Sequence, residues 1–130
     1  MARQRMISPG LWHDGRVVRL GDDLALLVWI GMCSQADDEG LAEAEPHALK
    51  AALALRATVP EVEAALEKIF SIGLAARYKV DDQTFAILPR WYRHQRLARP
   101  APSKHPRPPA DLLAQFPEYI EARRRTFNGP

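Results

Sequence analysis

The spacing of apolar residues in the first half of the chain predicts two helices before residue 58. Residues at i, i+3, i+4 and i+7 give an apolar face to a helix that begins near Asp22 and ends before the acidic run 37–40. This face consists of Leu24, Leu27, Val28 and Gly31. A second, shorter helix is expected to begin at Pro46, because proline suits the first helical position. Its buried face is expected to consist of Leu49, Ala52 and Leu53.

A third helix has the clearest start and end signals. Thr58 and Glu61 have the spacing of a capping box, in which the Thr58 hydroxyl accepts from the Glu61 amide and the Glu61 carboxylate reaches back. Apolar spacing then continues for two turns, and Gly73 is expected to end the helix. The buried face is predicted to consist of Val62, Ala65, Leu66, Ile69 and Phe70.

The apolar period changes to two after the third helix, which predicts two strands. Residues 76–80 and 84–88 are the strands, and residues 81–83 have the polar composition of a turn. Three helices followed by a hairpin predict an α+β fold of the winged helix-turn-helix type over residues 1–88. A short strand or turn packed on this core is expected from Met6, Ile7, Leu11 and Trp12.

Prolines divide the remainder into an arm and a tail. The arm comprises residues 89–109, and its residues 100–109 are expected to be extended because five of these ten residues are prolines, which cannot continue a helix. The tail, residues 110–130, is expected to be short and helical over residues 117–127.

Charge is distributed unevenly between these parts. The whole chain carries a formal charge of +2, which results from −4 over residues 1–88 and +6 over residues 89–130. A strongly basic segment beside an acidic body indicates an anionic partner for the arm. The alternative is a solvated basic tail that only keeps the protein in solution.

The arm and the hairpin therefore supply the candidate contacts to DNA. Guanidinium groups bind phosphates, and the interleaved aromatic rings are suited to stacking on bases. The predicted nucleic-acid-binding residues are Arg77, Lys79, Arg90, Trp91, Tyr92, Arg93, Arg96, Arg99, Lys104 and Arg107. The spacing does not distinguish duplex from single-stranded DNA. A role in clamping the arm to the body is the alternative for Trp91.

The third helix is poorly suited to reading DNA, although it has the position of a recognition helix. Glu61, Glu63 and Glu67 lie on it and Lys68 is its one cation, so DNA phosphates would repel it. These three glutamates are instead the candidates for contact with a protein.

Catalytic and metal sites are not predicted. Cys33 is the one cysteine, which excludes an internal disulfide and a cysteine-based zinc cluster within one chain. The four histidines lack metal-ligand spacing, and residues 37–40 are interpreted as a polar turn rather than a cation site. We therefore expect a non-enzyme without cofactor or metal. A soluble protein of the cytoplasm is expected, because no secretory or membrane-spanning segment is visible.

An ordered set of short motifs resembles the N-terminal winged-helix domain of phage and prophage replisome-organiser proteins, which are related to DnaD-type primosome loaders. The motifs are Arg5-Met6-Ile7 with Trp12, Ala36-Asp37-Asp38-Glu39-Gly40, Ile72-Gly73-Leu74 with Arg77-Tyr78, and Trp91-Tyr92-Arg93-His94-Gln95-Arg96 leading into Arg99-Pro100-Ala101-Pro102-Ser103-Lys104. The resemblance implies non-catalytic binding of origin DNA, self-assembly and recruitment of host replication factors. Members often continue into a longer C-terminal region, so we expect a shorter version without the partner-loading part.

Two functional hypotheses follow. The first is DNA binding in a phage-type replication initiation or regulatory complex, mainly through phosphate contacts of the arm and the hairpin. The second is a protein-interaction or oligomerisation module, or a phage-encoded inhibitor of a host protein, with the acidic third helix or the arm as the contact surface.

Overall fold

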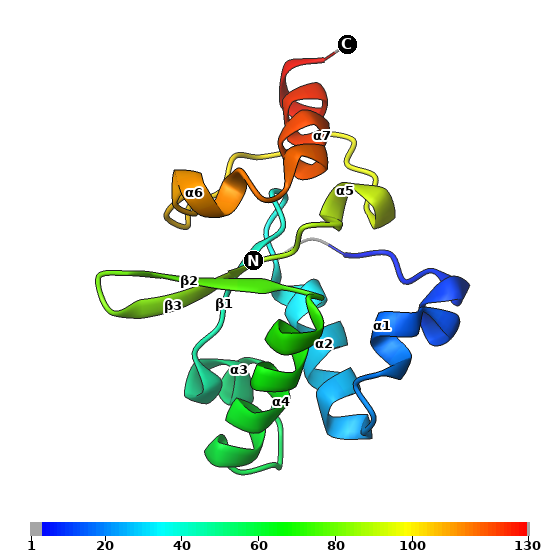
Figure 1. The fold of residues 1–130 in the computed structure, drawn as a ribbon, viewed down its shortest axis with the longest axis vertical. Coiled ribbons are helices and arrows are strands. Elements are labelled where there is room, and N and C mark those ends of the chain that lie inside the picture. The colour runs from blue at the N-terminus through cyan, green and yellow to red at the C-terminus, as the bar shows by residue number, and fades with distance from the viewer. Residues whose placement is uncertain (1–3, 130) are drawn as a thin grey trace.

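The computed structural model describes residues 4–129, which form an α+β fold with seven α-helices and a small antiparallel sheet in that range. Figure 1 shows the sheet in the middle of the molecule, with α2, α3 and α4 on one side and the C-terminal helices α6 and α7 on the other. The core is continuous through these layers, because buried side chains of both groups belong to one apolar cluster.

Three body helices occur where the apolar spacing predicts them. They are α2 (Asp23–Gln35), α3 (Pro46–Ala52) and α4 (Val59–Ile72). The capping box of α4 is present in full, and Gly73 ends this helix with a positive φ of 91°. In α2, Gly31 allows Leu53 to pack against the helix backbone, since an added Cβ would lie 2.3 Å from the Leu53 Cδ1 atom.

Two residues that are predicted to be buried on these helix faces are exposed in the structure. Leu27 is 53% exposed and Ala52 is exposed, although both were assigned to buried faces. On the same helix as Leu27, Val28 and Met32 are fully buried.

The sheet has the strand order β1-β3-β2 within residues 4–129, with β1 at Leu41–Glu43, β2 at Ala76–Val80 and β3 at Gln83–Ile87. The predicted hairpin is confirmed, and its turn is shorter than expected. Val80 pairs with Gln83, so the turn consists of Asp81 and Asp82, both with positive φ. Two positive φ values are typical of the tight turn that matches the twist of a hairpin. Strand β1 was not predicted.

The N-terminal segment corrects another expectation. It contains the 3-10 helix η1 (Pro9–His13) and the short helix α1 (Gly15–Val18), where a short strand or turn packed on the core is expected. Leu11 packs against the core, but Met6, Ile7 and Trp12 are each more than half exposed. The segment therefore leaves apolar side chains on the surface.

The C-terminal third contains α5 (Trp91–His94), α6 (Ala110–Leu113) and α7 (Pro117–Asn128). The predicted last helix is confirmed by α7, whereas α5 and α6 were not expected. Trp91 and Tyr119 are each 3% exposed and belong to the same core cluster as the body. The boundary drawn at Leu88 therefore does not coincide with a break in packing. No helix in residues 4–129 has the length and apolar character needed to cross a membrane.

Candidate nucleic-acid interface

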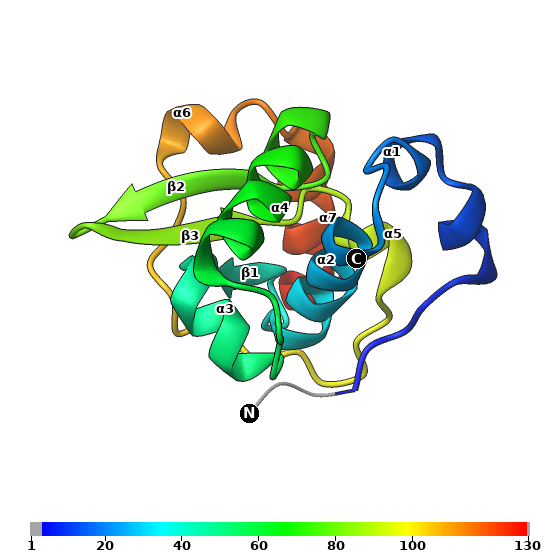
Figure 2. The same ribbon diagram turned by 90° about the horizontal axis from the view of Figure 1, so that it is seen from below.

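The arm (residues 89–109) wraps around the body of the fold and does not project into solvent. Figure 2 shows it leaving α5, passing beneath the body helices and rising beside the hairpin to reach α6. The Phe85 and His105 rings lie 5.5 Å apart, and the Tyr78 hydroxyl donates to the Pro106 carbonyl at 2.8 Å. The hairpin therefore holds the far end of the arm.

An acidic loop, residues 37–40 between α2 and β1, holds the middle of the arm. The Ala101 amide donates to Asp38 at 2.9 Å, and the Ser103 amide donates to Glu39 at 2.6 Å. The Ser103 hydroxyl also contacts the Asp37 carboxylate. The loop follows α2 as a polar turn, as predicted, but its role as the anchor of the arm was not predicted.

Glu39 is the centre of this anchor. Its side chain is fully buried and accepts from Arg107 Nη1 at 2.6 Å and from Arg123 Nε at 2.5 Å. The Tyr119 hydroxyl donates to the Glu39 carbonyl at 2.5 Å. Burial by itself would raise the pKa of Glu39, but hydrogen bonds from Arg123, the Ser103 amide and Arg107 outweigh it and hold this pKa below its usual value.

The lowered pKa of Glu39 predicts a pH-dependent contribution to stability. Ionised Glu39 favours the folded state, so its contribution is complete above the usual pKa of 4.5 and is lost as pH falls through the folded-state pKa. The destabilisation caused by Glu39→Gln, measured by urea unfolding, is therefore expected to be largest at neutral pH and to shrink below about pH 4.5. A destabilisation that is the same at every pH would contradict an ionised Glu39.

Asp38 joins the loop to the N-terminal segment. Its Oδ1 atom lies 2.9 Å from Arg5 Nη1, and both side chains are 5% exposed. The Arg5 guanidinium also donates to the Ala36 carbonyl and lies 4.9 Å from the centre of the Trp91 ring. The N-terminal segment, the acidic loop and α5 therefore meet at one buried charged contact.

The predicted aromatic contacts are placed differently from expectation. Trp91 is buried, and its indole N–H donates to the Asp38 carbonyl at 3.1 Å, so its ring is not available to stack on a base. Tyr92 is half-buried with its ring 5.4 Å from that of Tyr119. These positions agree with the alternative in which Trp91 clamps the arm to the body.

The predicted cations divide into two groups. Arg77, Arg93 and Arg107 form ion pairs with Glu67, Glu118 and Glu39. The others make no side-chain hydrogen bond or ion pair with residues 4–129; they are Lys79, Arg90, Arg96, Arg99 and Lys104. Arg96, Arg99 and Lys104 are exposed along the extended part of the arm.

The exposed face of α4 is acidic, as the sequence indicates. Glu61 is used by the capping box, and its hydrogen bonds with the Thr58 amide and hydroxyl lower its pKa. Glu67 binds Arg77 of β2, which lowers the pKa of this carboxylate. Glu63 is exposed. The face therefore offers carboxylates rather than cations to a partner.

Several residues of the anchor were not identified from the sequence, namely Arg5, Asp38, Glu39, Gln95, Tyr119 and Arg123. The Gln95 amide group both donates to and accepts from the Met6 backbone at 2.9 Å, which ties α5 to the N-terminal segment. The available signal was charge complementarity. An acidic run of three residues and a long segment without any acid occur in one short chain.

No group of three or more metal-ligating side chains occurs within residues 4–129. Comparison with known proteins gives no match to a family model, a curated protein or a solved structure.

Proposed function

We propose that the chain is a winged-helix DNA-binding protein of a phage-type replication initiation or regulatory complex, acting without catalysis in the host cytoplasm. The proposal combines the family resemblance with the surface charge of the arm. The order α2, α3, α4 and hairpin, with β1 added beside β3, is compatible with a winged helix.

The exposed cations of the arm are the observation that carries the proposal. Arg96, Arg99 and Lys104 lie in an extended segment that contains no acidic residue between Arg90 and Ala110. Each guanidinium or ammonium group is free to bind a phosphate and release a counterion. Arg107, by contrast, is bound to Glu39. The proposed contact surface is therefore smaller than the full set of arm cations.

The hairpin and α4 contribute little to this surface. Lys79 is an exposed cation on β2, but Arg77 is neutralised by Glu67. The carboxylates of α4 disfavour insertion into a major groove. We therefore propose that one extended segment, the arm, contacts the phosphates. Such contacts give affinity with little sequence preference.

The salt dependence of binding tests this proposal. If Arg96, Arg99 and Lys104 all contact phosphates, the logarithm of affinity falls with the logarithm of salt concentration with a slope of about −2.7 on duplex DNA. Fluorescence anisotropy of labelled duplex and single-stranded DNA over a salt series measures this slope. Salt-independent binding, or none at low salt, would refute the proposal.

A matched pair of variants locates the contact. Arg96→Ala/Arg99→Ala is expected to reduce the slope by about 2. Arg19→Ala/Arg56→Ala removes the same charge from exposed sites elsewhere and is expected to leave it unchanged. Equal losses would show that net charge, and not the arm, determines binding. Point variants are preferable to a chain ending at Leu88, because that truncation removes Trp91 and Tyr119 from the core.

A further inference from the structure

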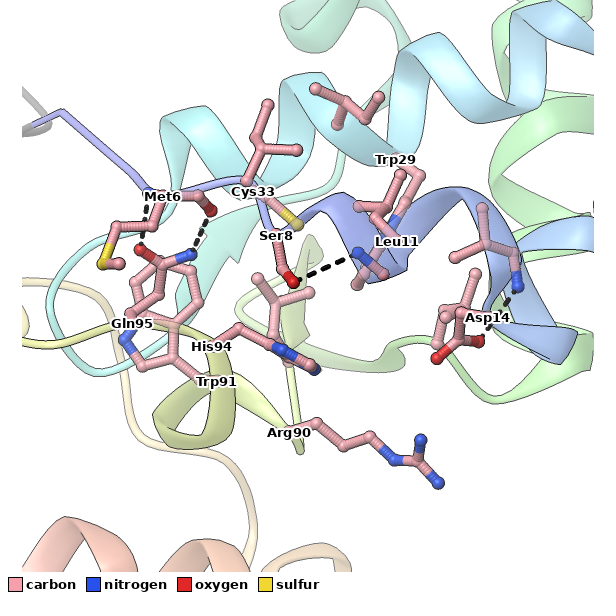
Figure 3. Close-up of a pocket in the computed structure, with 16 residues that line it drawn as sticks. Met6, Ser8, Leu11, Asp14, Trp29, Cys33, Arg90, Trp91, His94 and Gln95 are labelled. Carbon is pink, nitrogen blue, oxygen red and sulfur yellow. Dashed lines mark hydrogen bonds between the residues drawn. The ribbon is translucent and has the colours of Figure 1, made fainter.

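A cavity of about 250 Å³ lies between the N-terminal segment, α2 and α5 (Figure 3). Its walls are mainly apolar and include Leu11, Val17, Ile30, Leu74 and Leu88. Met6 and Ile7 also line the cavity and are each more than half exposed, so the apolar surface continues outward from it. A cavity that opens onto exposed apolar side chains is suited to an extended partner more than to an enclosed small molecule.

A buried donor in the wall of the cavity lacks an acceptor. The Nε1 atom of Trp29 is buried and has no hydrogen-bond partner among residues 4–129. Trp29 projects from α2 and lines the cavity together with Leu11 (Figure 3). Because buried N–H groups are nearly always paired, an acceptor from outside the described chain is expected there. The carbonyl groups of a peptide backbone are such acceptors.

Arg90 places a positive charge at the mouth of the cavity. Arg90 and His94 of the α5 region lie on one side of it (Figure 3), and neither makes a side-chain hydrogen bond or ion pair with residues 4–129. The one acidic side chain in the wall, Asp14, is engaged as the N-cap of α1, where it accepts from the Arg16 and Val17 amides. The rim therefore favours an acidic partner.

We propose that this cavity is the docking site for an acidic peptide segment of a partner protein. A large apolar side chain of the segment fills the cavity, and a backbone carbonyl accepts from the Trp29 indole. Neighbouring Asp or Glu side chains face Arg90 and His94. The proposal is independent of DNA binding by Arg96, Arg99 and Lys104, because these three residues do not line the cavity.

Selection from a library of short random peptides, displayed against the full chain, tests the chemistry of the partner. The enriched peptides are expected to combine an aromatic or branched apolar residue with nearby Asp or Glu. Failure to enrich any sequence, or enrichment of basic or uncharged sequences, would overturn the proposal.

A charge reversal at the rim and a matched reversal outside it test the location. Arg90→Glu is expected to lower the affinity for an enriched, labelled peptide by about tenfold. Arg96→Glu makes the same change nearby, outside the cavity lining, and is expected to change affinity by less than about twofold. Equal losses in the two variants would show general charge attraction and overturn the proposal.

The three tryptophans provide an internal readout that does not depend on any variant. In a ¹H–¹⁵N spectrum of the full chain, the Trp29 indole signal is expected to move downfield on peptide addition, because its N–H gains an acceptor. Trp12 does not line the cavity and is expected to move less. A Trp29 signal that is unchanged at saturation would overturn the proposal. A Trp29 signal that moves on addition of single-stranded DNA but not of peptide would also overturn the proposal.

Discussion

Replacing Glu39 by alanine is expected to lower the free energy of unfolding by about 3 kcal/mol, the range found when one partner of a buried ion pair is removed. The carboxylate is fully buried and accepts from Arg107, Arg123 and the Ser103 amide. Its removal leaves the Ser103 amide and Arg123 without their acceptor, whereas Arg107, whose side chain is 54% exposed, can be hydrated. Chemical denaturation of the purified variant measures the loss.

Two further measurements separate this anchor from a general effect of charge. Glu63→Ala removes an exposed carboxylate of α4 and is expected to change the free energy of unfolding by less than about 0.5 kcal/mol. Hydrogen exchange reports on the arm itself, because the Ala101 and Ser103 amides donate to Asp38 and Glu39. In Glu39→Ala the Ser103 amide is expected to exchange much faster. A stable variant with a protected Ser103 amide would show that the arm is held by other contacts.

Local signals in the sequence were sufficient to predict the body of the fold. The capping box of Thr58 and Glu61, the terminating Gly73 and the apolar stripe between them depend on residues within a few turns of one another, and α4 has these boundaries. The hairpin was predictable for the same reason, since its turn and alternating pattern are contiguous. Strand β1 was missed because three residues carry no detectable period and gain their pairing only from distant β3.

The arm was predicted less well because its position depends on contacts remote in sequence. Ser103 and Glu39 are separated by 64 positions, and Arg123 and Glu39 by 84. Seen in the sequence alone, six cations and two aromatic residues indicate a free nucleic-acid-binding segment. In the folded chain, the acidic loop binds Arg107, and Trp91, near the start of the arm, is buried. Net charge alone does not reveal which cations are bound within the molecule.

The close approach of Gly40 to Trp91 provides the second large expected effect. An added Cβ at Gly40 would lie 2.6 Å from the Trp91 Cγ atom, and Gly40 has a positive φ of 72°. Trp91 is buried and hydrogen-bonded to Asp38, so it cannot easily move aside. Gly40→Ala is therefore expected to lower the free energy of unfolding by about 2–4 kcal/mol, the combined cost of backbone strain and overpacking.

Gly73→Ala is the matched control for the backbone part of this effect. Gly73 also has a positive φ, of 91°, but no atom lies within 4 Å of its added Cβ. Its replacement is expected to cost about 1 kcal/mol, so the difference between the two variants measures the contact with Trp91. Equal losses would mean that Trp91 yields and that α5 is loosely attached. A larger loss for Gly40→Ala would show that the first turn of the arm is fixed to the acidic loop, which leaves the exposed cations beyond that turn to bind DNA.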